Sequence, residues 1–136
     1  MLLVSVILSL LAAIGTVAIA LKYILGPAPA GYHREMIAAQ GGEISDVVVK
    51  ITWALNKVFG FSLVGIALAM AGLAIFGVYA DIFWAKALLL LVGAAVCVPL
   101  AAVTFKMEKA TGVKTPWRPA VIMLALAFAA FGLSVI

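Results

Sequence analysis

The sequence predicts an all-α membrane protein, in which four transmembrane helices form one antiparallel up-down bundle and a short interfacial helix lies at the cytoplasmic side. Of the 136 residues, 68% are hydrophobic and only 10% are charged, and the mean hydropathy is +1.33. A soluble domain is about half apolar and about a quarter charged. The solvent for most of this chain is therefore lipid, which excludes a soluble enzyme and a nucleic-acid-binding domain. The single cysteine, Cys97, excludes a disulfide scaffold.

The first predicted span covers residues 2–25, and its only charge is Lys22. Such a helix is about 36 Å long, enough to cross a hydrocarbon core of ~30 Å. Gly26, Pro27 and Pro29 end it, because proline disfavours helix in its own position and in the one before it. A cleaved signal peptide is the alternative, but the chain starts without the basic residues that such a peptide carries.

The second predicted span covers residues 47–79 and has two parts. Ser45 is suited to cap the helix, and Asp46 favours the positive end of its dipole. The segment up to residue 58 is amphipathic, whereas residues 59–79 are almost wholly apolar. We therefore expect a helix that enters along the lipid headgroups and then spans.

The third and fourth predicted spans cover residues 83–105 and 118–136. Pro99 predicts a kink in the third span. A polar connection over residues 106–117 follows, and Pro119 opens the fourth span, since proline is tolerated in the first helical turn.

The basic residues predict which way the bundle points. With four spans, both termini lie on one side, and the loops after the first and third spans share the other. That shared side carries eight of the nine basic residues: Lys22, Arg34, Lys50, Lys57, Lys106, Lys109, Lys114 and Arg118. The opposite side has only Lys86. The positive-inside rule therefore predicts a bacterial cytoplasmic membrane protein with both termini in the periplasm.

Small residues recur at helical spacing in the spans, where they favour close contact between helices in lipid. They are Ser5, Ser9 and Ala13 in the first span, Gly65 and Ala69 in the second, and Gly93 in the third. The leading functional hypothesis is a non-enzymatic protein that acts by helix–helix association, either with itself or as an accessory subunit of another membrane protein.

Reactive groups are missing from the middle of every span, because no Asp, Glu, Arg or His lies there. Ion-coupled carriers need such an embedded group, and a haem between helices needs axial ligands that one histidine does not supply. We expect no cofactor, no metal and no nucleic-acid partner. A small oligomeric transporter or channel stays open as an alternative, and scattered hydroxyls at Ser5, Ser9, Thr16, Ser62 and Thr104 are the only polar groups for its path.

The cytoplasmic loops hold the remaining candidates. Residues 32–40 predict a short surface helix with Met36 and Ile37 on lipid, Arg34 and Glu35 as a solvated pair, and Gly41 and Gly42 as its end. Two sets of side chains follow. The predicted pocket comprises Tyr32, His33, Asn56, Lys57, Thr104 and Thr115, and the predicted headgroup contacts are Lys106, Lys109, Lys114, Arg118 and Trp117. The pocket motivates a third hypothesis, a protein that binds lipid or isoprenoid through these loops.

Three short motifs resemble a family of small bacterial four-span inner-membrane proteins. They are Tyr32-His33 after the first span, Lys57-Val58-Phe59-Gly60 leading into the second, and Thr111-Gly112-Val113-Lys114-Thr115-Pro116-Trp117 before the fourth. Members of that family often carry RVxGG and TGxxTPW at the last two places, and this chain departs from the first of these with Lys57, Phe59 and Phe61. The resemblance implies the four-span fold and no particular activity.

Overall fold

The computed structural model describes every residue from Met1 to Ile136 and is almost entirely helical. Its elements are α1 (Leu2–Leu25), α2 (Gly31–Ala39), α3 (Asp46–Gly72), the π-helical segment η1 (Leu73–Val78), α4 (Phe83–Thr111) and α5 (Trp117–Ser134). Since η1 continues α3, four helices are long and apolar enough to cross a membrane, with mean hydropathies of 2.7, 2.3, 2.5 and 1.6 along the chain. The protein is thus an all-α four-helix bundle with the composition of a multi-pass membrane protein.

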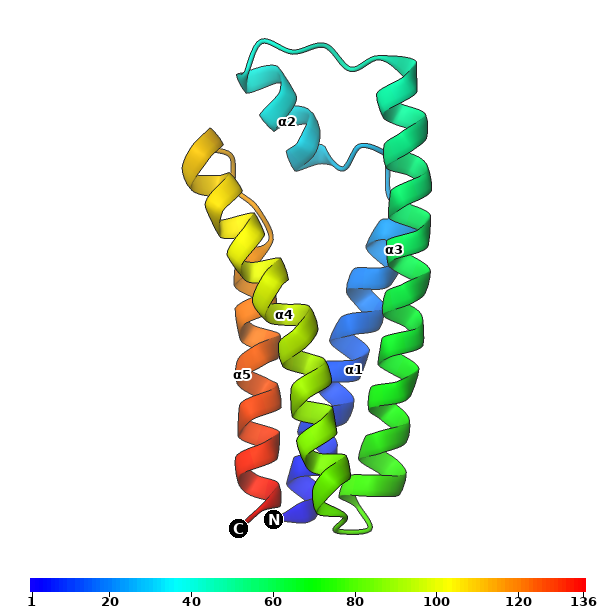
Figure 1. The fold of residues 1–136 in the computed structure, drawn as a ribbon, viewed down its shortest axis with the longest axis vertical. Helices are drawn as coiled ribbons and strands as arrows, with labels where there is room; N and C mark the ends of the chain where they lie inside the picture. Colours follow the sequence, from blue (N-terminus) through cyan, green and yellow to red (C-terminus); the bar gives the residue numbers. More distant parts are fainter.

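The four long helices run up and down, and both termini lie at the same end of the bundle (Figure 1). We call this end the terminal end and the opposite one, which carries α2, the α2 end. Helix α1 packs against α3 and α5, and α5 packs against α4, whereas α3 itself has little contact with α4. Figure 1 shows the consequence: the pair α1 and α3 diverges from the pair α4 and α5 towards the α2 end.

The core occupies the terminal half of the bundle. One cluster contains Val6, Ala74, Val78 and Leu89, and the next contains Ala12, Ala13 and Met70. At Gly77, a Cβ would lie 2.3 Å from the Cβ of Ala85. Glycine therefore allows η1 to approach α4 closely enough to close this end of the bundle.

The buried residue Lys86 stabilises the terminal end of the bundle. Its side chain is only 6% exposed, and its ammonium group contacts the Asp81 carboxylate at 2.5 Å. The same group donates to the Ser134 carbonyl at 2.5 Å, one of the last carbonyls of α5 that have no intrahelical partner. A cation at a helix C-terminus also favours the helix dipole. Lys86, the one basic residue predicted on the side of the termini, therefore links the start of α4 to the end of α5.

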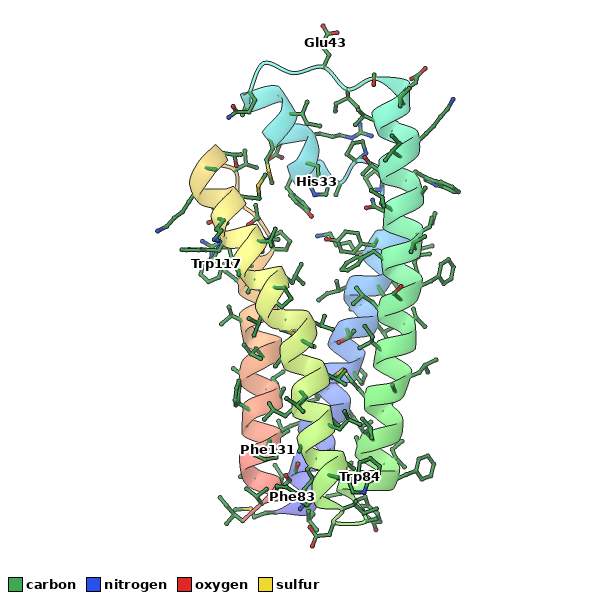
Figure 2. The ribbon with its side chains drawn as sticks, viewed as in Figure 1. His33, Glu43, Phe83, Trp84, Trp117 and Phe131 are labelled. Carbon is green, nitrogen blue, oxygen red and sulfur yellow. The ribbon has the colours of Figure 1, made fainter.

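Apolar side chains cover much of the outer surface. Phe83 and Trp84 are exposed at the terminal end, at 65% and 63%, and Trp117 lies towards the α2 end of the bundle (Figure 2). Aromatic residues at both ends of an apolar band are typical of proteins that span a bilayer. An apolar outer surface is what the 68% hydrophobic composition predicts.

The helix ends follow the sequence with some differences. Ser45 caps α3 as predicted, since its hydroxyl accepts from the Val48 amide. The helix begins at Asp46, η1 ends at Val78, and α5 covers Trp117–Ser134, each within two residues of the predicted bounds. The connection predicted over residues 106–117 is shorter than expected, because α4 continues through residues 106–111. Polar residues such as lysine and glutamate favour helix, and α4 ends only where Gly112 adopts a left-handed conformation with φ of 71°.

The small residues fall on two kinds of surface. Ser5, Ser9 and Ala13 are buried, and a Cβ on Gly93 would contact the Ala127 side chain at 3.3 Å. Gly65 and Ala69, predicted to pack helices, are exposed on the outer face of α3. The glycine that α3 presents to α1 is Gly60, where a Cβ would lie 2.5 Å from the Ile24 side chain. Gly65 lies five residues after Gly60, a rotation of about 140° around the helix, so the α1–α3 contact lies on a different face of α3 from the one expected.

Candidate functional site

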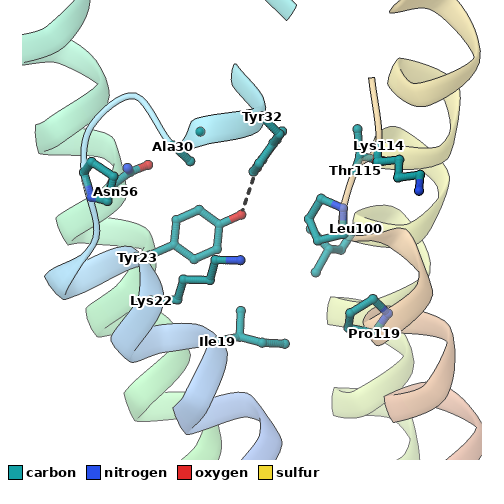
Figure 3. Close-up of a pocket in the computed structure, with 13 residues that line it drawn as sticks. Ile19, Lys22, Tyr23, Ala30, Tyr32, Asn56, Leu100, Lys114, Thr115 and Pro119 are labelled. Atoms are coloured by element: carbon teal, nitrogen blue, oxygen red, sulfur yellow. Dashed lines mark hydrogen bonds between the residues drawn. The ribbon is translucent and has the colours of Figure 1, made fainter. Parts of the chain in front are cut away.

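A cavity of about 560 Å³ fills the space between the two diverging helix pairs below α2 (Figure 3). We call it the α1–α5 cavity. Its wall combines apolar residues, two phenols, an amide and two lysines, and no acidic side chain contributes. The residues are Ile19, Lys22, Tyr23, Pro27, Ala30, Gly31, Tyr32, Asn56, Leu100, Lys114, Thr115, Pro116 and Pro119.

A second cavity of about 500 Å³ adjoins the first on the side of α3 and α4. We call it the α3–α4 cavity. It shares Tyr23, Tyr32, Asn56 and Leu100 with the α1–α5 cavity, and it adds His33, Thr52, Leu55, Val58, Phe59, Ser62 and Thr104. The shared residues form the partition between the two spaces. Of the six residues predicted to make a pocket, five line one cavity or both.

The hydroxyl groups of Tyr23 and Tyr32 lie 3.2 Å apart and share a hydrogen bond, drawn as a dashed line in Figure 3. Tyr23 comes from the last turn of α1, and its ring meets Phe59 of α3 edge to face at 4.9 Å. Tyr32 comes from the first turn of α2. Burial and the bond to Tyr23 raise the pKa of Tyr32 far above its usual range, so the Tyr32 phenol stays neutral.

α2 is held over the cavities by its own polar contacts. Arg34 donates to the carbonyl oxygens of Pro29 at 3.1 Å and of Ala28 at 3.2 Å, so it is not the solvated partner of Glu35 that the sequence suggested. Met36, predicted to rest on lipid, is only 7% exposed and faces the protein. The short helix therefore acts as a roof over the α2 end.

His33 packs against Tyr32, with ring centroids 4.0 Å apart, and it lines the α3–α4 cavity. Burial lowers the pKa of this imidazole, and no charged side chain lines the cavity around it. At neutral pH the ring is therefore uncharged. The structure brings no group of three His, Cys, Asp or Glu side chains together to hold a metal ion.

Asn56 is the deepest polar group of the site. Its residue is 8% exposed, it lines both cavities, and its carboxamide makes none of the side-chain hydrogen bonds in the protein. Its amide atoms are accessible from the cavities, because Trp117 Nε1 is the one side-chain N or O atom that is both fully buried and unpaired. The Asn56 donors and acceptor therefore face the cavities unused.

Lys57, predicted to line the pocket, does not reach either cavity. Its ammonium group donates to the carbonyl oxygen of Ile24 at the end of α1, and it lies 5.5 Å from the centre of the Trp53 ring. Successive helical residues point about 100° apart, and the Lys57 side chain is directed to the end of α1 and not into the cavities that Asn56 lines. Lys57 instead satisfies a carbonyl that has no partner within its own helix.

Thr104 and Thr115 line the cavities with hydroxyl groups that are already engaged. The Thr104 hydroxyl donates to the Leu100 carbonyl at 2.6 Å, and the Thr115 hydroxyl donates to the Thr104 carbonyl at 2.7 Å. Glu108 completes this connection by accepting from the Thr115 amide at 2.8 Å and from Arg118 at 3.1 Å. These groups join the ends of α4 and α5, and the two threonines shape the cavity wall.

The basic residues expected at lipid headgroups behave differently from one another. Lys106, Lys109 and Lys114 are exposed at the α2 end, with the Lys109 ammonium 4.9 Å from the Phe105 ring centre. Arg118 pairs with Glu108 and lies over the Trp117 ring at 4.7 Å. Only Lys114 of this set also lines a cavity.

The hydroxyl groups within the spans are also engaged. Ser5 donates to the Ala130 carbonyl at 2.6 Å, which ties α1 to α5. Ser9, Thr16 and Ser62 each donate to the carbonyl four residues earlier in their own helix. Such bonds satisfy the hydroxyl inside the helix that carries it.

The sequence analysis counted Lys22 among the basic residues of the cytoplasmic side and included neither Lys22 nor Tyr23 in the pocket. Both lie near the end of α1 and line the α1–α5 cavity. The signal was their place at the end of an apolar span, directly before the proline turn that leads to α2. Comparisons of the chain with protein-family models, curated proteins and solved structures gave no match.

Proposed function

We propose that this protein binds an amphiphilic lipid of the bilayer, without covalent chemistry, in the space between its two helix pairs. The observation that carries the proposal is the α1–α5 cavity of about 560 Å³. Its volume is that of a ligand site, and its wall changes from apolar residues such as Ile19 and Leu100 to the phenols and lysines near α2. A lipid has the same sequence of chemistry from chain to headgroup.

The proposed setting is a bacterial cytoplasmic membrane with the α2 end at the cytoplasmic surface and both termini in the periplasm. The eight-to-one distribution of basic residues supports this orientation. The resemblance of the Tyr32-His33 and Thr111–Trp117 motifs to small bacterial inner-membrane proteins supports the bacterial assignment.

Native mass spectrometry of the full chain, extracted in mild detergent, tests the proposal. The wild type is expected to retain a bound lipid, and Leu100→Trp is expected to lose it because Leu100 lines both cavities. Leu91→Trp is the matched control, since Leu91 lies on the same helix and is 63% exposed. Equal lipid retention in the wild type and Leu100→Trp would contradict the proposal.

Helix–helix association is a second candidate function, and the outer face of α3 supports it. Gly65 and Ala69 are exposed there, and no atom lies within 4 Å of a Cβ built on Gly65. Small residues on a lipid-facing surface allow a second helix to approach closely. Under this proposal the extracted protein is an oligomer or a complex, and Gly65→Leu dissociates it while Ala18→Leu, on the exposed face of α1, does not. A wild-type protein that is extracted only as a monomer argues against it.

A further inference from the structure

We propose that the α1–α5 cavity selects a lipid headgroup that carries a phosphate and has a net negative charge. Lys22, Asn56 and the Tyr23–Tyr32 pair recognise the phosphate. This inference rests on the proposed lipid-binding function and adds the chemistry of the headgroup. It concerns the polar part of the cavity, beneath the start of α2.

The charge of the cavity wall is the first argument. Lys22 and Lys114 are its only charged residues, and neither has an ion-pair partner in the protein. Figure 3 shows the Lys22 ammonium directed into the space between the helix pairs, beside the Tyr23 ring. No carboxylate lines the cavity, and the Glu108 carboxylate behind Thr115 is paired with Arg118, so the two lysines leave a positive potential that favours an anion.

The two phenols supply a donor that the protein does not use. Because Tyr23 and Tyr32 share one hydrogen bond, one of their two hydroxyl hydrogens bonds the other oxygen and one stays free. Both residues line the cavity. A phosphate oxygen next to this pair would therefore receive a hydrogen bond from it.

Asn56 is the second, independent observation. Its residue is more than nine-tenths buried, its carboxamide has no partner in the protein, and Figure 3 shows it on the α3 side of the same space. The amide group offers two N–H donors. A ligand oxygen in the cavity would give this amide a hydrogen-bond partner that the protein itself does not supply.

The start of α2 adds backbone donors. Ala30 and Gly31 line the cavity, and α2 has neither a side-chain cap nor an acidic residue in its first turn. The first amide groups of a helix have no intrahelical partner and carry the positive end of the helix dipole. They complement the side-chain donors and do not define the site by themselves.

These donors favour an anionic lipid over a zwitterionic one. A phosphate has several acceptor oxygens for the ammonium, phenol and amide groups. A zwitterionic headgroup also brings a cation, and the cavity wall has no carboxylate to receive it. The chain of the lipid would leave along Ile19, Leu100 and Pro119, which form the apolar part of the wall.

The test is a binding titration of the delipidated full chain by native mass spectrometry, with phosphatidylglycerol and phosphatidylcholine of the same acyl chains. Phosphatidylglycerol is expected to bind about tenfold more tightly, because both lipids carry the phosphate and only phosphatidylcholine brings a choline cation into a cavity lined by two lysines. Lys22→Gln removes the charge, and Asn56→Asp keeps the size of the side chain while adding a repelling carboxylate. Each is expected to abolish most of this preference.

Lys50→Gln is the matched control, because Lys50 is exposed at the same end and lines neither cavity. Circular dichroism during heating checks that each variant is folded. If Asn56→Asp unfolds, Lys22→Gln alone tests the preference, because Lys22 is at an exposed position and its replacement is expected to leave the fold intact. Equal binding of the two lipids, with both lost in Leu100→Trp, overturns the headgroup inference and leaves the proposed function standing.

Two further outcomes separate the sources of the phosphate and the two proposals. If inorganic phosphate binds with the same dependence on Lys22 and no lipid binds, the recognition of phosphate is upheld, and the lipid source and the proposed function both fail. If neither lipid nor phosphate binds the wild type, both proposals fail.

Discussion

Lys57 illustrates how a basic side chain near a membrane surface stabilises a helix end. Its ammonium group donates to the Ile24 carbonyl, one of the carbonyls that α1 leaves unpaired. Lys57→Met is expected to lower the free energy of unfolding by about 1–2 kcal/mol, because that carbonyl loses its partner at a half-buried position. Unfolding in mixed micelles, titrated with a denaturing detergent, measures the change. Lys50→Met, on the same helix and exposed, is the control, and an equal loss in the two variants contradicts this role.

His33 makes a prediction about pH. Burial lowers the pKa of this imidazole from its ordinary value of 6.5, so the folded state favours the neutral ring. The resulting stabilisation is fully present above pH 6.5 and is lost as the pH falls through the lower, folded pKa. His33 is the only histidine, so an NMR titration of its ring is unambiguous. A midpoint above 6.5 would contradict the prediction, and His33→Gln is expected to remove this part of the pH dependence.

The site residues show what sequence alone predicts at this scale. Asn56 and Lys57 were both placed in the pocket because they are the deepest polar residues of the second predicted span. Adjacent helical residues point in different directions, and only Asn56 lines the cavities. Glu108 was missed because its role depends on the contact between the ends of α4 and α5, which no local pattern reveals.

At the scale of helices, Gly60 and Gly65 make a matched pair. A Cβ on Gly60 would lie 2.5 Å from Ile24 and 3.0 Å from the Ala20 carbonyl oxygen, whereas a Cβ on Gly65 would meet nothing within 4 Å. Gly60→Ala is expected to destabilise the α1–α3 contact by about 1–3 kcal/mol, the usual cost of overpacking. Gly65→Ala is expected to leave the monomer at least as stable as before, because nothing obstructs the added methyl group and alanine favours helix more than glycine does. The same micelle unfolding measures both, and equal stabilities would show that α1 and α3 do not pack through Gly60.

The spans were predictable from sequence because long apolar runs bounded by proline, glycine and charges leave little choice of helix. The end of α4 was not predictable in the same way. Residues 106–111 are mostly polar, which suggested a connection, but their side chains still favour helix. The pairing of helices was not predictable either. Every span has small residues on more than one face, and which face meets a neighbour depends on the whole bundle, as the exposed Gly65 and the buried Gly60 show.

At the scale of the whole molecule, the two ends of the bundle have different tasks. The terminal end is closed by the cluster around Val6 and Leu89 and by Lys86, which joins the turn before α4 to the last carbonyls of α5. At the α2 end the two helix pairs lie apart, and α2 lies across the space between them (Figure 1). Helices that pack together in the terminal half and a polar-lined cavity at the α2 end suit a lipid site at one membrane surface.

The most direct test of the lipid site is a crystal structure of the protein grown from a lipidic mesophase. We predict an elongated ligand in the α1–α5 cavity, with its headgroup beside the Tyr23 and Tyr32 hydroxyl groups and its chain along Leu100. Helix pairs that close onto each other and leave no such cavity, or a cavity that holds only water, would contradict the account.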